Sequence, residues 1–380
     1  MKKYHFESYV TGFMKSVGEM RGASVHFPHL LSFWEELLGV DDMRGVAYLQ
    51  APEHMAGVMV ASSMYTHYTS GQQTFEVSEA MHEMLLRTDL QGITLADMIL
   101  PYECLYISVP KGKYKLWGGP GSKYHECNGV YVRRRLYFEL PRDVAIAIGE
   151  DQTPRIGDIR DIIPKLKTAG LSPEEVAKYQ RQGFIIHAAC LESEHSTSWG
   201  DDCHTWVSLS LADWEDPKYA TDRDNDVESF MKSKIFHEMM NCETNQLEFL
   251  SSEEQKRHAE QFFNLAKVAI NTIVYLNHGL ETKTTQRRDN KKLKHFQELY
   301  KNATSGSKLR TYGRQVTKAC KPTVHLIGPG VQEMRAPLPN DILVRGHWHT
   351  YWVGKGRAKR QLNWVQPYLR NKTVDGDVSV

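Results

Sequence analysis

The chain contains 380 residues, 41% of them hydrophobic, and carries a formal net charge of +1. This length permits one large domain or two ordinary ones, and the apolar fraction is large enough to form a core. No signal peptide is recognisable, and no apolar run reaches the roughly 18 residues that a membrane span requires. We therefore expect a cytoplasmic protein without membrane contact, whose six cysteines are reduced.

Formal charge is divided unevenly along the chain. Between Glu281 and Lys372 there are 20 Lys or Arg and 5 Asp or Glu residues, which gives +15. The other 288 residues hold 27 basic and 41 acidic residues, which gives −14. This polarity favours an anionic partner for the C-terminal part, and RNA is the leading candidate. Alternatively, the acidic and basic parts pack against each other.

The first hundred residues predict mainly helices. Apolar residues recur at helical spacing in Phe27 to Leu38, and the same pattern is present in Val77 to Leu86. Beyond them, alternating apolar residues predict strands over Leu105 to Val109 and Gly129 to Leu140. The apolar run from Val144 to Ile148 predicts a further short strand. These strands predict an antiparallel meander with one solvated face.

The region from Asp151 to Gly183 is expected to leave this sheet. Ser172 followed by Glu175 predicts a capping box for a helix that extends to Gln182. The chain then returns to the sheet with a strand at Phe184 to Ala189.

A further strand is expected at Thr205 to Leu211, and the best-defined helix of the chain follows at Lys256 to Leu276. Apolar residues cover most of the circumference of that helix, so we expect it to be buried centrally. Residues 281–320 are basic and polar, with a short helix at Lys291 to Asn302. They predict a mobile basic arm that ties the central helix to the C-terminal end.

The C-terminal part predicts a β-hairpin. From Ile342 to Val353, apolar residues at alternate positions oppose a polar, aromatic and cationic face. The next six residues, Gly354 to Lys359, include two glycines, which tolerate positive φ and indicate a turn before a second extended run, Gln361 to Gln366. Pro367 then ends ladder pairing or marks a sheet edge.

Together these elements predict an α+β fold. A mainly antiparallel sheet is closed by the C-terminal hairpin and packs against an N-terminal helical section and a long central helix. We expect four sections in one continuous domain. They are a mainly helical section at residues 1–100, a mixed α+β core at 101–280, the basic arm and an extended connector at 281–340, and the hairpin at 341–372.

Motifs for metal or cofactor chemistry are weak. No convergent carboxylates, catalytic cysteine arrangement or glycine-rich phosphate loop stands out, so we expect no cofactor and no metal. Zinc binding is a weaker alternative, because the spacing of the candidate ligands fits no standard finger and His187 lies in a predicted strand, where it can simply be hydrogen-bonded. The candidate ligands are His187, Cys190, His195, Cys203 and His204.

The polar face of the hairpin supports three interpretations. His347 and His349 share this face with Arg345, and two imidazoles with an arginine can cleave RNA by metal-independent acid–base catalysis. The same side chains can instead stack on bases and hold phosphates without chemistry. In a purely structural interpretation, Trp348 and Trp352 anchor the hairpin in the core. Spacing alone does not select among the three, and we favour binding.

The same hairpin carries a recognisable sequence pattern. It consists of Arg345-Gly346-His347-Trp348-His349, then Tyr351-Trp352, Gly354, Gly356 and Lys359, and finally Trp364 and Gln366-Pro367. The pattern resembles the C-terminal signature of a family of anti-CRISPR proteins that act against the type V CRISPR effector nuclease and are scattered over phages and plasmids. A weaker resemblance covers Leu100 to Pro110 and the helix from Phe262 to Leu276, whereas most of residues 120–260 depart from the family pattern.

The resemblance implies a function that composition does not show. Members of the family are thought to recognise the N-terminal segment of the nascent effector nuclease and to cause translation-dependent loss of its messenger RNA. For this chain, the resemblance implies a peptide-recognition groove and a basic surface that faces RNA or the ribosome, in the cytoplasm of a bacterial host cell. The divergence of residues 120–260 leaves room for a different nascent protein as the target.

We therefore predict a phage or plasmid inhibitor of the anti-CRISPR type that recognises a nascent polypeptide or host protein and lowers target expression at the mRNA level. It is expected to act by binding rather than as an enzyme. The alternatives are a metal-independent ribonuclease that uses His347 and His349, and a protein-binding inhibitor without RNA contact. The residues expected to bind RNA or the partner are Arg345, His347, Trp348, His349, Tyr351, Trp352, Lys355, Arg357, Lys359 and Arg360.

Overall fold

The structure of the chain is a computed structural model. It describes residues 4, 6, 9–10, 14, 27–37, 62–94, 97–117, 124–140, 142–147, 155–158, 166, 168–172, 174–175, 180–190, 203–210, 227–240, 250–278, 281–331, 341–355 and 359–371. Among these residues, no helix combines the length and the apolar character that a membrane crossing needs.

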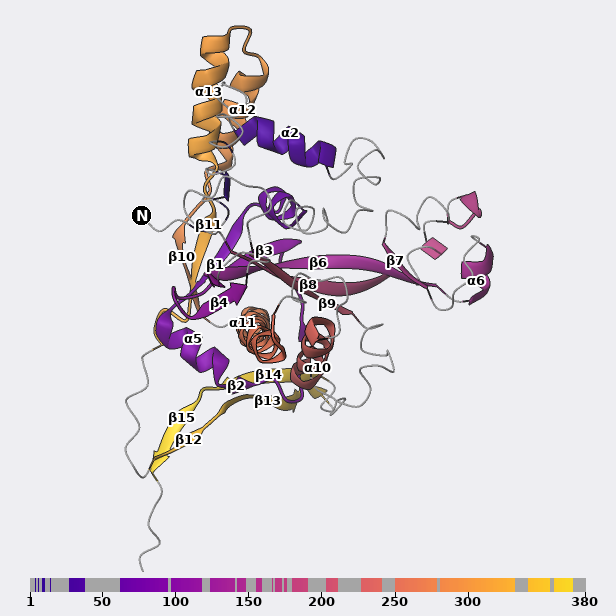
Figure 1. The fold of residues 1–380 in the computed structure, drawn as a ribbon, viewed down its shortest axis with the longest axis vertical. Coiled ribbons are helices and arrows are strands. Elements are labelled where there is room, and N and C mark those ends of the chain that lie inside the picture. Colours follow the sequence, from indigo (N-terminus) through magenta and orange to yellow (C-terminus); the bar gives the residue numbers. More distant parts are fainter. Residues whose placement is uncertain are drawn as a thin grey trace, which may run out of the picture.

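A large mixed sheet forms the centre of the fold (Figure 1). Its strand order is β10-β11-β1-β3-β6-β8-β9, and β7 pairs with the far end of β6. Strand β1 runs parallel to β11 and β3, and the other pairs are antiparallel. The strands are β1 (Gln73–Val77), β3 (Cys104–Ser108), β6 (Gly129–Leu140), β7 (Arg155–Asp158), β8 (Gln180–Cys190), β9 (Cys203–Ser210), β10 (Thr282–Gln286) and β11 (Thr323–Ile327). The strands predicted at 105–109, 129–140, 184–189 and 205–211 are thereby confirmed.

Helices cover both faces of this sheet (Figure 1). Alternate residues of β3 point to opposite faces, and all of them are buried. Leu105 packs in the cluster that includes α11 (Ser252–Asn277), whereas Tyr106 packs in the cluster that includes α2 (Phe27–Leu37). The solvated face predicted for these strands is therefore wrong at β3.

The central helix α11 begins after a capping box. Oγ of Ser251 accepts a hydrogen bond from the N–H of Glu254 at 3.3 Å, and Oε2 of Glu254 accepts one from the N–H of Ser251 at 3.0 Å. From Phe262 to Tyr275 the side chains are buried almost without interruption. Helices α5 (Glu79–Leu86) and α10 (Val227–Met240) pack beside it. The predicted central burial of this helix is confirmed.

The segment predicted as a mobile basic arm is instead part of the fold. Strand β10 pairs with β11 at the edge of the large sheet, and α12 (Asn290–Lys301) and α13 (Gly306–Ala319) form a helical hairpin (Figure 1). Leu293 and Val316 are buried in the same cluster as Trp34 of α2. The prediction of a mobile arm is wrong because the many charged residues of this segment make the narrow apolar stripe that contains Leu293 and Val316 hard to recognise in the sequence. The short helix predicted within it is confirmed as α12.

The predicted C-terminal β-hairpin is confirmed. Strands β13 (Gly346–Val353) and β14 (Lys359–Val365) pair antiparallel, with Trp348 opposite Trp364. The hairpin joins β2 (Thr88–Asp89) in a separate three-stranded sheet below α11, rather than adding a strand to the large sheet. The α+β class is confirmed, and α11 lies between the large sheet and this three-stranded sheet (Figure 1).

The first strand of the predicted hairpin is interrupted at Arg345. Its initial part, β12 (Asp341–Val344), pairs with β15 (Tyr368–Asn371) in a two-stranded ribbon. Ladder pairing of β14 ends before Pro367, as predicted. A further two-stranded sheet consists of β4 (Tyr114–Trp117) and β5 (Tyr124–Cys127).

Two predictions between residues 140 and 183 are wrong. The short strand predicted at Val144 to Ile148 is helix α6 (Arg142–Ala147), because a short apolar run fits either structure and Asp143 favours a helix N-terminus. The excursion predicted from Asp151 to Gly183 contains β7, which pairs with β6, and the first residues of β8.

The capping box predicted inside that excursion is confirmed. The N–H of Ser172 donates to Glu175 Oε2 at 2.8 Å, and the N–H of Glu175 donates to Ser172 Oγ at 3.3 Å. However, β8 already begins at Gln180, so the helix does not extend to Gln182 as predicted.

Candidate functional site

The outward side of the C-terminal hairpin carries the predicted histidine pair. His347, His349 and Tyr351 are all exposed on β13. The ring centroids of His347 and His349 lie 6.3 Å apart, and the ring of Tyr351 meets that of His349 edge-on at 4.4 Å. The predicted spacing of two residues therefore places these rings side by side in solvent.

The inward side of the hairpin packs on the C-terminal half of α11. Trp348 and Leu362 are buried, and Trp348 stacks with its cross-strand partner Trp364 at a centroid distance of 6.2 Å. Trp364 meets Tyr275 of α11 edge-on at 5.4 Å. The aromatic pair thus holds one side of the hairpin against the core, while the other side stays open to solvent.

Asn271 of α11 connects the hairpin to two other elements. Its Oδ1 accepts a hydrogen bond from Nε1 of Trp348 at 2.8 Å. Its Nδ2 donates to the carbonyl oxygens of Leu85 and Thr88, at 3.0 and 3.1 Å. The Asn271 side chain is fully buried, so these bonds replace the water that its amide would otherwise bind.

Thr88 and Gly346 form the tightest contact between the hairpin and β2. Thr88 Oγ1 donates to the carbonyl of Met84 at 2.8 Å and accepts from Nε1 of Trp364 at 3.1 Å. A Cβ atom on Gly346 would lie 2.6 Å from this hydroxyl and 2.7 Å from Cδ of Pro367. Glycine is therefore required at this position of the Arg-Gly-His-Trp-His pattern.

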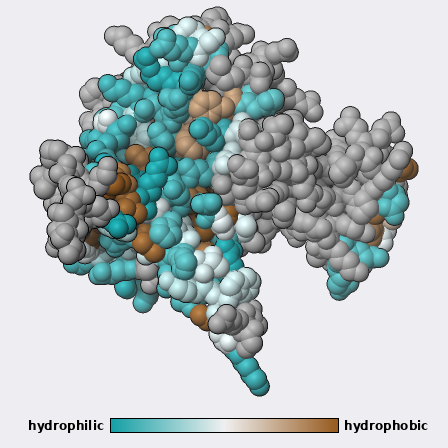
Figure 2. Space-filling model, turned by 90° about the horizontal axis from the view of Figure 1, so that it is seen from below, coloured by the Kyte–Doolittle hydropathy of each residue, from teal (hydrophilic) through white to brown (hydrophobic). Residues whose placement is uncertain are grey.

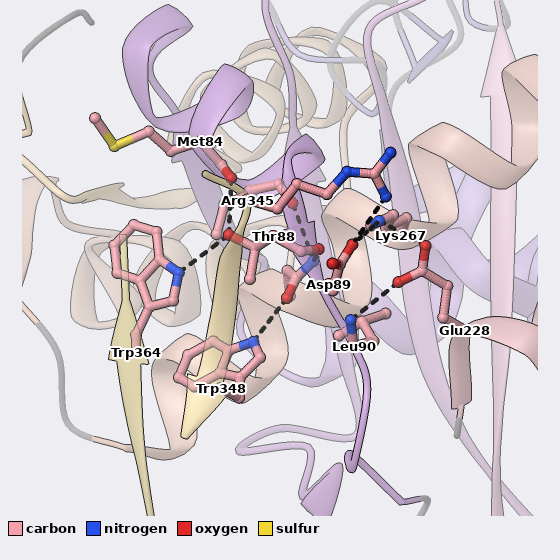
Figure 3. Close-up of polar contacts among 11 residues, drawn as sticks. Met84, Thr88, Asp89, Leu90, Glu228, Lys267, Arg345, Trp348 and Trp364 are labelled. Carbon is pink, nitrogen blue, oxygen red and sulfur yellow. Dashed lines mark hydrogen bonds and ion pairs between the residues drawn. The ribbon is translucent and has the colours of Figure 1, made fainter. Parts of the chain in front are cut away.

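A chain of charges runs from the core to the hairpin edge (Figure 3). Nζ of the buried Lys267 lies 2.6 Å from Oε1 of Glu228 and 3.7 Å from Oδ1 of Asp89. The same Asp89 oxygen lies 3.4 Å from Nη1 of Arg345, whose side chain is 72% exposed. Arg345 is thus restrained on one side by Asp89 while most of its guanidinium remains accessible.

Arg360 ties the second strand of the hairpin to the segment between β2 and β3. Its Nη1 lies 2.6 and 2.8 Å from the two carboxylate oxygens of Asp97, and its Nη2 donates to the carbonyl of Gly92 at 2.6 Å. This predicted binding residue is engaged within the protein. Nearby, burial lowers the pKa of His278, whose ring lies 5.9 Å from that of Trp348.

The turn end of the hairpin projects beyond these anchors. Gly354 has φ +85°, as the predicted turn requires, and Lys355 is exposed beside it. Trp352 is 58% exposed, so its predicted role as a core anchor is wrong. The reason is its distance from β2, which pairs only with the first two residues of β13. Arg357 and the side chain of Lys359 lie outside the described residues.

Exposed apolar side chains accumulate on the C-terminal strands. Figure 2 views the molecule from below and shows hydrophobic residues (brown) gathered within a largely hydrophilic surface. The large exposed apolar residues of these strands are Ile342, Leu343, Tyr351, Trp352 and Tyr368. We call the exposed residues Arg345, His347, His349, Tyr351 and Trp352 the hairpin surface. All five are among the predicted binding residues, whereas the adjacent β12–β15 ribbon was not predicted.

The weaker zinc alternative gains no support from the described residues. Within them, no group of three or more His, Cys, Asp or Glu side chains is arranged to hold a metal ion. His187 is buried, and its Nδ1 lies 3.0 Å from Oγ of Ser63, so it is hydrogen-bonded within the core as its strand position predicted. His195 lies outside the described residues.

Comparisons with known proteins give a family assignment. A solved structure titled "Crystal structure of AcrVA2" is similar to this chain with a TM-score of 0.43 and 10% sequence identity, over 96% of this chain and 99% of that one. No curated protein matches the chain. The family model described as AcrVA2-like, anti-CRISPR type V subtype A2 family, matches residues 75–372, which include the hairpin surface and every described strand apart from the first two residues of β1. The chain therefore belongs to the AcrVA2-like family of type V anti-CRISPR proteins.

Proposed function

We propose that this anti-CRISPR protein recognises a nascent polypeptide, of the type V effector or of another host protein, through the hairpin surface and lowers the expression of that target at the mRNA level. The proposal places it in the cytoplasm of a bacterial cell that carries a phage or plasmid. The observation that carries it is a firmly anchored hairpin whose Tyr351 and Trp352 side chains are 44% and 58% exposed.

Two features of the C-terminal strands support polypeptide binding. Exposed Tyr, Trp and Arg side chains are the residue types that dominate protein interfaces, and anchoring before binding reduces the entropy that association loses. In addition, β12, β14 and β15 each pair with one neighbouring strand among the described residues. Free strand edges can accept an extended chain through main-chain hydrogen bonds, which suits a nascent polypeptide that has not yet folded.

The proposal is tested by comparing two messages in cells that express this protein. One message encodes the type V effector, and the other is identical except for a disrupted start codon. We expect the protein to lower only the translated message. The Tyr351→Ala, Trp352→Ala double variant should leave both messages unchanged, whereas Ile146→Ala, which removes an exposed apolar side chain from the distant α6, should act like the wild type. Equal loss of both messages would refute recognition during translation.

A metal-independent ribonuclease is the second candidate. It is favoured by the 6.3 Å separation of the His347 and His349 rings on one exposed side, with Arg345 beside them to stabilise a charged phosphorane. The purified protein would then cleave RNA in the presence of EDTA, and His347→Ala would abolish cleavage while the protein stays folded. The absence of cleavage by the wild type would exclude this candidate.

A third candidate is a protein-binding inhibitor without RNA contact. Its supporting observation is the apolar part of the same surface, which needs no nucleic acid to find a partner. If the purified protein blocks DNA cleavage by a preassembled effector complex, inhibition does not require translation. Unchanged cleavage in that assay would leave the mRNA-level proposal in place.

A further inference from the structure

The basic C-terminal segment is divided between two ends of the molecule. The helices α12 and α13 lie at one end of the longest axis, and the C-terminal strands lie at the other (Figure 1). A single partner surface therefore cannot use the whole excess of +15 that residues 281–372 carry. The positive charge of α12 and α13 therefore indicates a binding surface separate from the C-terminal strands.

Residues 290–319 carry a high density of positive charge. They contain eight Lys or Arg and one Glu, a net charge of +7, and all eight basic side chains are exposed. No Asp or Glu within the described residues forms an ion pair with any of them. We call these eight residues the basic helical hairpin: Lys291, Lys292, Lys294, Lys301, Lys308, Arg310, Arg314 and Lys318.

Several of these cations occupy electrostatically unfavourable positions. Lys291 and Lys292 lie in the first turn of α12, and Lys308 lies in the first turn of α13. A helix N-terminus carries a partial positive charge, so cations there reduce helix stability. Helices α5 and α11 instead have Glu in the first turn. At α12 the N-cap carboxylate of Asp289 offsets part of this cost, whereas the N-cap of α13 is the neutral Ser305. An anionic partner would therefore stabilise the first turn of α13 most.

The opposite side of the two helices fixes them to the body of the protein. Leu293 and Val316 are buried beside Trp34 of α2, and Tyr68 accepts a hydrogen bond from Nε2 of Gln297 at 2.7 Å. The cations are therefore displayed by a rigid support. Arg310, Arg314 and Lys318 recur every four residues, about 6 Å apart along the axis of α13, and form one stripe.

The helices α12 and α13 expose little of the aromatic surface on which single-stranded nucleic acids stack. Their rings at Phe296, Tyr300 and Tyr312 are all partly buried, and within these two helices only the imidazole of His295 is exposed. Single strands are bound by stacking bases on exposed aromatic rings between basic residues. Double-helical RNA is bound through its phosphates and 2′-hydroxyl groups, for which Lys and Arg without aromatic partners suffice.

We propose that the basic helical hairpin binds the phosphate backbone of double-helical RNA. The choice of RNA over DNA rests on the proposed function above, in which the protein acts on messages during translation. The duplex would lie along the Arg310, Arg314 and Lys318 stripe, with the basic first turn of α13 at one end of that stripe. Polypeptide recognition and RNA binding would then occur at opposite ends of one molecule.

Fluorescence anisotropy of the purified full-length protein tests this proposal. The probes are an RNA duplex of about 20 base pairs, the DNA duplex of the same sequence and one RNA strand alone, in about 50 to 200 mM salt. We expect the RNA duplex to bind most tightly, with affinity falling as salt rises. The triple variant Arg310→Gln, Arg314→Gln, Lys318→Gln should bind at least about tenfold more weakly at the same salt concentration and show a shallower salt slope.

The matched control is the triple variant Lys111→Gln, Lys115→Gln, Lys256→Gln. It removes the same charge from exposed positions outside α12 and α13, and it should retain the wild-type affinity within about twofold. Equal weakening of both variants would refute the assignment to this hairpin. Tighter binding of the single strand, or equal binding of the two duplexes, would refute duplex RNA as the ligand.

The two proposals fail separately. The anisotropy experiment contains neither a ribosome nor an effector message, so its outcome does not depend on mRNA loss in cells. If the hairpin-surface variant Tyr351→Ala, Trp352→Ala still lowers the translated message, the proposed function fails while RNA duplex binding stands. If the duplex does not bind, the inference fails while polypeptide recognition stands.

Discussion

Trp348 donates a hydrogen bond from its indole Nε1 to Oδ1 of Asn271 at 2.8 Å, and both side chains are buried. Trp348 belongs to the C-terminal hairpin, and Asn271 belongs to the central helix α11. The Asn271 amide also bonds to the carbonyls of Leu85 and Thr88, so one side chain joins three elements that are distant in sequence. The position of the hairpin surface therefore depends on Asn271.

Replacing Asn271 with leucine should destabilise the protein by about 2–4 kcal/mol. The change keeps the branching and the number of side-chain heavy atoms, but it leaves the buried Trp348 N–H without its partner and removes one hydrogen bond from each of the carbonyls of Leu85 and Thr88. Denaturant unfolding followed by tryptophan fluorescence measures the effect. The exposed Asn363→Ala on the outer side of β14 is the control and should change stability by less than about 0.5 kcal/mol. A similarly small change in stability for Asn271→Leu would show that the hydrogen bonds of Asn271 do not stabilise the folded protein.

Alanine at Gly346 should displace the hairpin from β2. Its Cβ would lie 2.6 Å from Thr88 Oγ1, so either strand must move and the hydrogen bond from Trp364 to Thr88 is strained. We expect a loss of about 1–3 kcal/mol, the usual cost of overpacking, together with a weaker near-ultraviolet tryptophan signal. Gly306→Ala, where an added Cβ meets nothing within 4 Å, should be neutral or slightly stabilising.

Methionine at Lys267 should destabilise the protein by about 3 kcal/mol, because Glu228 and Asp89 would lose the cation that they share. Adding Glu228→Gln to this variant should recover part of the loss. The new amide removes a negative charge, and its oxygen can still accept the hydrogen bond from the N–H of Leu90. Chemical denaturation of both variants measures the difference. Equal stability of the single and double variants would contradict this account of the pair.

Stability should fall as the pH decreases below about 6.5, because two histidines are buried in their neutral form. Burial lowers the pKa of His67 to about 3, with a contribution from Arg288, and that of His258 to about 4. In this range the unfolded chain binds protons that the folded protein does not. Each residue should therefore remove about 2 kcal/mol of stability at about pH 5.

Unfolding midpoints between about pH 7 and 5 test this dependence. His258→Gln should reduce the slope, since its amide oxygen can still accept the hydrogen bond that Nδ1 of His258 takes from the N–H of Trp117 at 3.1 Å. The exposed Asn363→Ala, which changes no titratable group, should leave the slope unchanged. An unaltered slope in His258→Gln would mean that its protonation is not linked to unfolding.

Periodicity in the sequence was sufficient for the main elements of the fold. The alternation in the C-terminal hairpin and the apolar circumference of α11 each reflect a local spacing that one element imposes on its own residues. Periodicity did not predict that α12 and α13 pack against the core. Their basic residues are far more numerous than the buried apolar residues, Leu293 and Val316, which form only a narrow stripe. Periodicity also failed at Val144 to Ile148, where the run is too short to distinguish a strand from a helix.

The position of the hairpin in the fold could not be predicted, because it depends on contacts between distant segments. Strand β2 contributes only Thr88 and Asp89, too few residues for an alternation to be visible. One signal was present, since Lys267 and Asn271 are polar residues four apart in the mainly apolar second half of α11 and therefore share one side of it. That spacing marks the side of α11 on which Lys267 meets Asp89 and Asn271 meets Trp348.

Part of the candidate site was likewise visible in the sequence. The outward orientation of His347 and His349 follows from strand alternation, and the exposure of Arg345 follows from its charge. The ion pair of Arg360 with Asp97 and the exposure of Trp352 could not be predicted from the sequence. Both depend on the position of β2 and the residues after it relative to the hairpin.

The most direct test of polypeptide recognition at the hairpin surface is co-purification of the effector message with the protein from cells that translate it. The wild type should capture this message as part of ribosome–nascent chain complexes, and puromycin, which releases nascent chains, should abolish the capture. The Tyr351→Ala, Trp352→Ala variant should capture only background amounts, whereas Ile146→Ala should match the wild type. Puromycin-resistant capture, or equal capture by the hairpin variant, would contradict the account.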